Sequence, residues 1–156
     1  MSDDLKALYQ AVILDHYKHP RHAGEPETWA HVARGDNPLC GDRITVWLTV
    51  EDGRVTAIGH EAVGCALSKA SASLMCMLTA GGDSEAARVL SERVEALATG
   101  VAAPEGSDDP LAALSGVKDF PSRRTCVTMA WRALCAALDA PETHLDFSTS
   151  QWKTEH

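Results

Sequence analysis

Residues 43–63, with the sequence RITVWLTVEDGRVTAIGHEAV, decide the fold because they encode a β-hairpin. The first eight residues alternate in the manner of a strand and are rich in β-branched side chains. Asp52-Gly53 is a typical hairpin turn, and residues 54–63 supply the returning strand. Since a hairpin folds back on itself, the beginning of its first strand and the end of its second strand must be neighbours in space.

Helical patterns surround this hairpin, so the sequence predicts an α+β fold. A small antiparallel sheet of about three strands, with helices packed on one face, satisfies the order of helix, hairpin and further helices. Residues 19–42 are loop-like, with a short edge strand around Trp29 to Ala33. Helices are expected over residues 2–18, 66–80, 84–99, 110–115 and 121–139, the first capped by Ser2 and stopped by Pro20.

The chain length fits a single domain. Its 156 residues are expected to form one domain over residues 1–140, followed by a C-terminal tail over residues 141–156 that is partly disordered. Hydrophobic residues make up 45% of the chain, which is typical of a globular protein.

Charge and hydropathy exclude several classes of function. The net charge of -8 repels phosphate backbones and anionic lipids, and the basic stretch at residues 122–124 is too short to reverse this. We therefore expect neither a nucleic-acid nor a membrane partner. The sequence has no apolar run of about 18 residues, and its acidic start differs from a signal peptide. The predicted location is the cytoplasm, where five scattered cysteines are not a disulfide framework.

Three of these cysteines and one aspartate are placed to meet at a metal ion. Cys40 and Asp42 flank Gly41 just before the first hairpin strand, whereas Cys65 follows the second strand, so the hairpin brings them together. Cys126 lies in the first turns of the last long helix, where the helix dipole favours a thiolate, and Cys65 lies at a helix start too. Three sulfur atoms and one oxygen suit tetrahedral zinc, although iron binds similar groups.

Spacing alone leaves a simpler alternative open, because isolated cysteines are often core residues. Cys76 and Cys135 are interpreted in that way. The histidines at positions 16, 19 and 22 straddle Pro20, so surface or partner contacts are expected for them rather than metal binding. His60 is expected to be structural. Ser68 and Lys69 lie one turn beyond Cys65 and are candidates to support it.

Four segments in order along the chain resemble the SufU proteins, a branch of the IscU/NifU N-terminal family. They are LYQAVILDHYKHPR (8–21), NPLCGDR (37–43), GCALSKASAS (64–73) and FPSRRTC (120–126). The similarity extends over about residues 5–140. IscU scaffolds carry a His immediately before the last Cys, where this chain has Thr125, and residues 82–104 resemble an insertion that separates SufU from IscU proteins. Both features favour SufU.

The resemblance implies an IscU/SufU-like fold with zinc bound by Cys40, Asp42, Cys65 and Cys126. It also implies a role in iron–sulfur cluster assembly, as a zinc-dependent sulfurtransferase that partners and activates a SufS-type cysteine desulfurase. Cys40 would accept persulfide sulfur when a His of the desulfurase replaces it on the metal, Arg123 would lie near the site, and the sulfur would pass to a SufBCD-type scaffold.

Two other functions remain open at this stage. One is an IscU-like scaffold on which an iron–sulfur cluster is assembled, with iron or the cluster in place of zinc. The other is a binding module whose zinc is only structural. The protein is expected to be a monomer or a weak homodimer.

Overall fold

The structure is a computed structural model that describes residues 3–106, 108–148 and 153–155. Its elements, in chain order, are α1 (Asp3–Lys18), β1 (His31–Asn37), β2 (Asp42–Glu51), β3 (Arg54–Val63), α2 (Ala66–Thr79), α3 (Ser84–Thr99), the 3-10 helix η1 (Ala112–Asp119), α4 (Pro121–Asp139), β4 (Glu142–Asp146) and β5 (Lys153–Glu155). Ser2, the expected cap of α1, lies outside the described residues.

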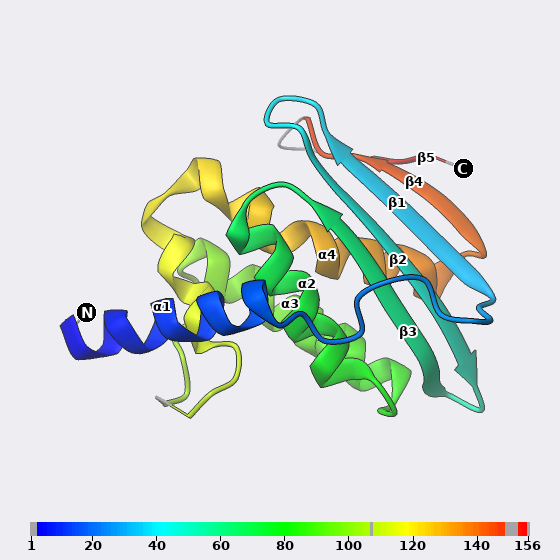
Figure 1. The fold of residues 1–156 in the computed structure, drawn as a ribbon, viewed down its shortest axis with the longest axis horizontal. Helices are drawn as coiled ribbons and strands as arrows, with labels where there is room; N and C mark the ends of the chain where they lie inside the picture. Colours follow the sequence, from blue (N-terminus) through cyan, green and yellow to red (C-terminus); the bar gives the residue numbers. More distant parts are fainter. Residues whose placement is uncertain (1–2, 107, 149–152, 156) are drawn as a thin grey trace.

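The fold has two layers, with the sheet on one side and the helices gathered on one of its faces (Figure 1). This confirms the predicted α+β architecture. The expected sheet of about three antiparallel strands was wrong in detail, because among the described residues the sheet is mixed and has five strands in the order β3-β2-β1-β4-β5. The hairpin of β2 and β3 is antiparallel, as predicted, whereas β1 and β4 pair in parallel.

The parallel strand β4 lies within residues 141–156, the stretch for which a partly disordered tail was expected. The side chains of Thr143, Leu145 and Phe147 are buried in alternation, which is the pattern of a strand with one face on the core. A Cβ atom built on Gly35 of β1 would lie 2.2 Å from the Phe147 ring, so the missing side chain makes room for that ring. Residues 142–146 therefore belong to the sheet, whereas residues 149–152 and 156 lie outside the described residues.

Two other local expectations are corrected. The edge strand expected around Trp29 to Ala33 is β1, which runs from His31 to Asn37 and is an inner strand, because it pairs with β2 on one side and β4 on the other. The short helix expected over 110–115 is the 3-10 helix η1, which begins two residues later and continues to Asp119.

The core positions α2 and α4 relative to each other and to the sheet. Trp131 of α4 is fully buried and donates a hydrogen bond from its indole Nε1 to Ser71 Oγ of α2 at 3.0 Å. Ser71 in turn donates to the Val127 carbonyl at 2.5 Å. Since α4 also packs against β1, β2 and β4, the N-termini of both helices are fixed near the end of the hairpin.

Two histidines are buried between elements. His16 is 4% exposed and its Nδ1 lies 2.7 Å from Ser73 Oγ of α2, so the expected surface role was wrong for this residue, although His19 and His22 are exposed. His60 of β3 is 3% exposed and its Nδ1 lies 3.3 Å from Cys76 Sγ, in agreement with the structural role expected for His60 and the core position of Cys76.

No helix within the described ranges combines the length and the apolar character needed to cross a membrane.

The burial of His60 predicts a specific pH dependence of stability. Burial lowers the pKa of His60 from the ordinary 6.5 to about 4. Between pH 6.5 and about pH 4, His60 is protonated in the unfolded chain and neutral in the folded chain. The free energy of unfolding therefore falls as the pH falls. The loss from this residue between pH 7 and pH 5 is about 2 kcal/mol.

Urea denaturation of the metal-free protein at both pH values measures this loss. The variant His60→Gln should show a smaller decrease than the wild type, and His19→Gln, at an exposed position, serves as the control. Equal decreases for the wild type and His60→Gln would contradict the prediction.

Candidate metal centre

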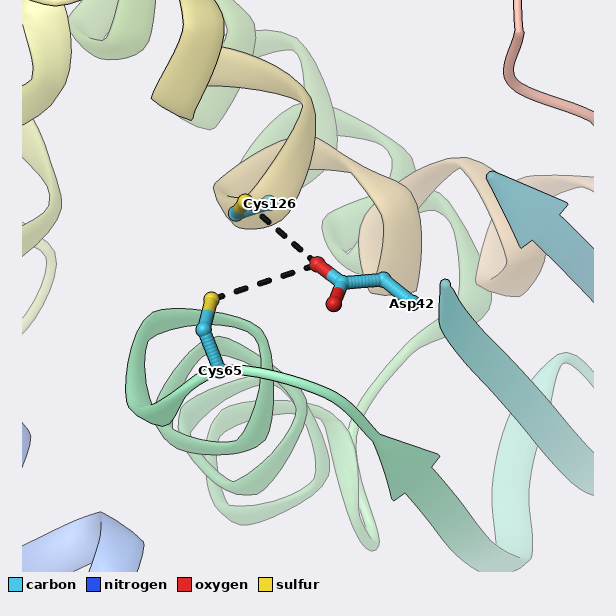
Figure 2. A group of neighbouring side chains, drawn as sticks. All are labelled: Asp42, Cys65 and Cys126. Carbon is cyan, nitrogen blue, oxygen red and sulfur yellow. Dashed lines mark hydrogen bonds between the residues drawn. The ribbon is translucent and has the colours of Figure 1, made fainter. Parts of the chain in front are cut away.

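Asp42, Cys65 and Cys126 converge at the end of the hairpin (Figure 2). The carboxylate oxygen of Asp42 and the two sulfur atoms all lie within 4.8 Å of one another. Asp42 Oδ2 is 3.9 Å from Cys65 Sγ and 3.4 Å from Cys126 Sγ. Three elements supply these groups, namely the first residue of β2, the residue before α2 and the second turn of α4. The predicted meeting of the hairpin ends is thus observed.

The carboxylate of Asp42 is buried against Gly64, in a space that any larger side chain at position 64 would occupy. Asp42 is 4% exposed. A Cβ atom on Gly64 would lie 2.0 Å from Asp42 Oδ1 and 2.6 Å from its Cγ, and Gly64 has a φ of 140°, which side chains rarely adopt. Gly64 is a residue that the sequence reasoning missed. Its only signal is its position immediately before Cys65.

Cys65 is the N-cap residue of α2, with extended backbone angles. Its Sγ lies 3.3 Å from Ser68 Oγ, one turn into the helix, and Ser68 Oγ also donates to Asp42 Oδ2 at 3.3 Å. Ser68 was a candidate to support Cys65, and the structure places it in contact with both groups. The other candidate, Lys69, points its ammonium group over the Tyr17 ring, 5.6 Å from the ring centre.

Cys126 is buried on α4 and donates its thiol hydrogen to Asp42. The thiol groups of Cys65 and Cys126 interact, and this interaction shifts their two pKa values in opposite directions. A hydrogen bond from Cys126 lowers the pKa of Cys65, and the same interaction, followed by burial, raises the pKa of Cys126. A thiolate at Cys65 is therefore favoured at neutral pH.

Cys40 lies outside this group of three, on the exposed turn between β1 and β2. Two backbone hydrogen bonds to the Asn37 carbonyl, from Cys40 and Gly41, close the turn, and Gly41 adopts a φ of 78°. Partial burial raises the pKa of Cys40, and the nearby negative charges of Asp42 and Cys65 raise it further. The charges of Asp42 and Cys65 therefore act on the Cys40 thiol. Its Sγ itself lies 3.8 Å from the Asn37 carbonyl oxygen.

The remaining predicted residues take simpler places. Arg123 is exposed at the start of α4, one turn before Cys126. Cys76 is fully buried, and Cys135 is half-buried on α4. Neither of these two cysteines is part of the group of three.

The donor set fits a zinc ion. Zinc binds sulfur at about 2.3 Å and carboxylate oxygen at about 2.0 Å, so a tetrahedral site separates these donors by about 3.5 Å. The two distances from Asp42 Oδ2, 3.4 and 3.9 Å, lie on either side of that value. A buried carboxylate beside two thiols is also costly without a positive partner, and a bound cation removes that cost.

A model of a known family matches residues 8–142, and its description is the NifU-like N-terminal domain. The chain belongs to this family. The match includes all four predicted ligands and spans β1 to α4.

Named relatives of this NifU-like chain function in sulfur and iron–sulfur chemistry. It is 37% identical to the zinc-dependent sulfurtransferase SufU of Bacillus subtilis, over 84% of this chain and 89% of that protein. It is 35% identical to the iron–sulfur cluster assembly scaffold protein IscU of Thermotoga maritima, over 85% and 94%. A crystal structure of a NifU-like protein (N-terminal) from Brucella abortus superposes with a TM-score of 0.76 at 26% identity, covering 85% and 92%. The family is thus one of iron–sulfur cluster assembly proteins.

Because Asp42 fills the space beside Gly64, adding a single methyl group at position 64 should weaken metal binding. The variant Gly64→Ala should displace the Asp42 carboxylate and lower zinc affinity by roughly 10-fold or more, because the position of a ligand depends on the groups around it. Titration with a chromophoric zinc chelator measures the affinity. The matched control is Gly53→Ala, since Gly53 also has a positive φ but has open space around it. Equal affinities of the two variants would show that Gly64 does not shape the site.

Proposed function

We propose that this protein holds one zinc ion between Cys40, Asp42, Cys65 and Cys126 and accepts persulfide sulfur on Cys40 from a SufS-type cysteine desulfurase in the cytoplasm. The observation that carries the proposal is the arrangement of the four groups. The three donors Asp42, Cys65 and Cys126 converge, and a third cysteine, Cys40, lies beside them on an exposed turn. A site of this kind can keep its metal while one thiolate reacts.

The similarity to a zinc-dependent sulfurtransferase supports zinc as the metal. Bound zinc would keep the ligand thiols deprotonated at neutral pH and would protect them from oxidation. Asp42 would be the one oxygen ligand, held by its buried position at the start of β2.

Cys40 is suited to accept sulfur because it lies on an exposed turn beside the three other proposed ligands. Its pKa is raised, so the free thiol is a poor nucleophile until a metal or a cation stabilises the thiolate. Arg123, exposed one turn before Cys126, would supply such a cation when Cys40 leaves the metal.

The transfer itself would be a thiol–disulfide exchange. The Cys40 thiolate attacks the outer sulfur of the persulfide on the desulfurase. A new sulfur–sulfur bond forms at Cys40 as the old one breaks, and the electron pair leaves with the thiolate of the desulfurase. No external oxidant or reductant is consumed. The Cys40 persulfide would then pass its outer sulfur to a SufBCD-type scaffold.

An apolar rim around the site supports docking of a protein partner. Leu39, Val63 and Phe120 are 79%, 51% and 60% exposed, and each lies close in sequence to a proposed ligand or to the helix that carries one. Large apolar side chains exposed at a reactive site are typical of a surface that another protein covers.

A second function, assembly of an iron–sulfur cluster on this protein, is favoured by the similarity to a named IscU scaffold. The same donors would hold iron. Thr125 in place of the histidine that precedes the last Cys in IscU scaffolds speaks for the sulfur-transfer function. The metal content of the purified protein separates the two, since zinc leaves it colourless and a cluster makes it brown.

The variant Cys40→Ala tests the acceptor role. After incubation with a SufS-type desulfurase and cysteine, mass spectrometry should detect added sulfur on the wild type and none on Cys40→Ala, and stimulation of the desulfurase should be lost. Cys135→Ala, which removes a half-buried cysteine away from the site, is the matched control and should behave as the wild type. Normal stimulation by Cys40→Ala would reject the mechanism.

A further inference from the structure

We infer that Ser68 is a positioning residue that holds Asp42 and Cys65 together as a preformed part of the metal centre, an inference that rests on the metal-binding function proposed above. Ser68 is 5% exposed and lies three residues after Cys65, in the first turn of α2. Its side chain lies outside the proposed ligand set and contacts two of the proposed ligands, Asp42 and Cys65.

The hydroxyl of Ser68 lies between two ligand side chains. Its Oγ is 3.3 Å from Asp42 Oδ2 and 3.3 Å from Cys65 Sγ, and it is 3.1 Å from the Cys65 carbonyl oxygen. The hydroxyl has one hydrogen to donate and two lone pairs to accept with. It can therefore donate to the carboxylate or to the sulfur, and either arrangement keeps the two groups side by side.

This position matters because β2 and α2 carry the two ligands separately. Asp42 is the first residue of β2 and Cys65 precedes α2, so motion between the strand and the helix would separate them. The Ser68 hydroxyl is fixed to α2 and reaches across to the β2 carboxylate. A third proposed ligand, Cys126, contacts the same oxygen from α4. Asp42 Oδ2 is thus the point at which all three elements meet.

The consequence concerns the moment at which Cys40 leaves the metal. Of this chain's own groups only Asp42, Cys65 and Cys126 then hold the ion, and the ion is lost readily if one of these three is free to rotate. Ser68 restrains Asp42 at this step. Loss of the Ser68 hydroxyl should therefore weaken metal binding in the wild type and weaken it more strongly when Cys40 is absent.

A simpler role for Ser68 is stabilisation of the helix start through its bond to the Cys65 carbonyl. The two roles differ in their effect on the bound metal. A change confined to helix stability alters how much protein is folded, whereas a change in ligand position alters the spectrum of the metal complex. Co²⁺ reports this difference, because its visible bands depend on the identity and geometry of its ligands.

The test uses the full chain with zinc and with Co²⁺ as probes. Zinc affinity is measured by competition with a chromophoric chelator for the wild type, Ser68→Ala, and the pair Ser68→Thr and Ser68→Val, which have the same shape and differ only in the hydroxyl. Ser68→Ala and Ser68→Val should bind zinc roughly 10- to 100-fold more weakly, and Ser68→Thr should bind more tightly than Ser68→Val. Ser91→Ala on α3, at another buried helical serine, should leave affinity unchanged.

The Co²⁺ spectra complete the test. The visible bands of Ser68→Ala and Ser68→Val should shift relative to the wild type, and the affinity loss caused by Ser68→Ala should be larger in the Cys40→Ala background. Unchanged affinity, or weaker affinity with an unchanged Co²⁺ spectrum, would overturn the positioning role of Ser68. A wild-type protein that binds neither metal would instead reject the proposed function itself.

Discussion

The antiparallel pairing of β2 with β3 is the constraint on which the rest of the structure depends. Its register, from Arg43 opposite Val63 to Glu51 opposite Arg54, leaves Asp42 and Gly64 facing each other at the open end. A shift of one residue would turn every side chain to the other face and would remove Asp42 from the core side. The sheet pairing therefore determines both the core and the first contact of the metal centre.

The helices complete the site because their N-termini are fixed at this same end. Ser71 and Trp131 join α2 to α4 through buried hydrogen bonds, and this contact sets the distance between the helix that follows Cys65 and the helix that carries Cys126. Buried polar groups of this kind are costly unless every partner is satisfied, so they favour one arrangement of the two helices over others. The geometry of the donors is thus a property of the core.

Short-range signals predicted most of the fold and the site, and long-range contacts account for the rest. Local alternation predicted the hairpin. Asp83 and Gly100, the caps of α3, predicted the bounds of that helix, and Pro121 predicted the start of α4. In contrast, the short strand expected around residues 29–33 did not reveal that β1 continues to Asn37 between β2 and β4, because that extension depends on pairing with segments far away in the sequence. For the site, the hairpin argument placed Asp42 beside Cys65. The role of Gly64 depended on a distance that only the folded chain contains.

The position of Cys40 has a physical reason within this framework. Asp42, Cys65 and Cys126 are held by a strand, a helix start and a helix, whereas Cys40 is held by a four-residue connection with Gly41 at a positive φ. A turn of that kind changes conformation at lower cost than a strand or a helix. In the proposed sulfur transfer a reactive ligand must move and a retaining ligand must not, so the difference in local rigidity supports the mobile role proposed for Cys40 and the retaining role proposed for the other three.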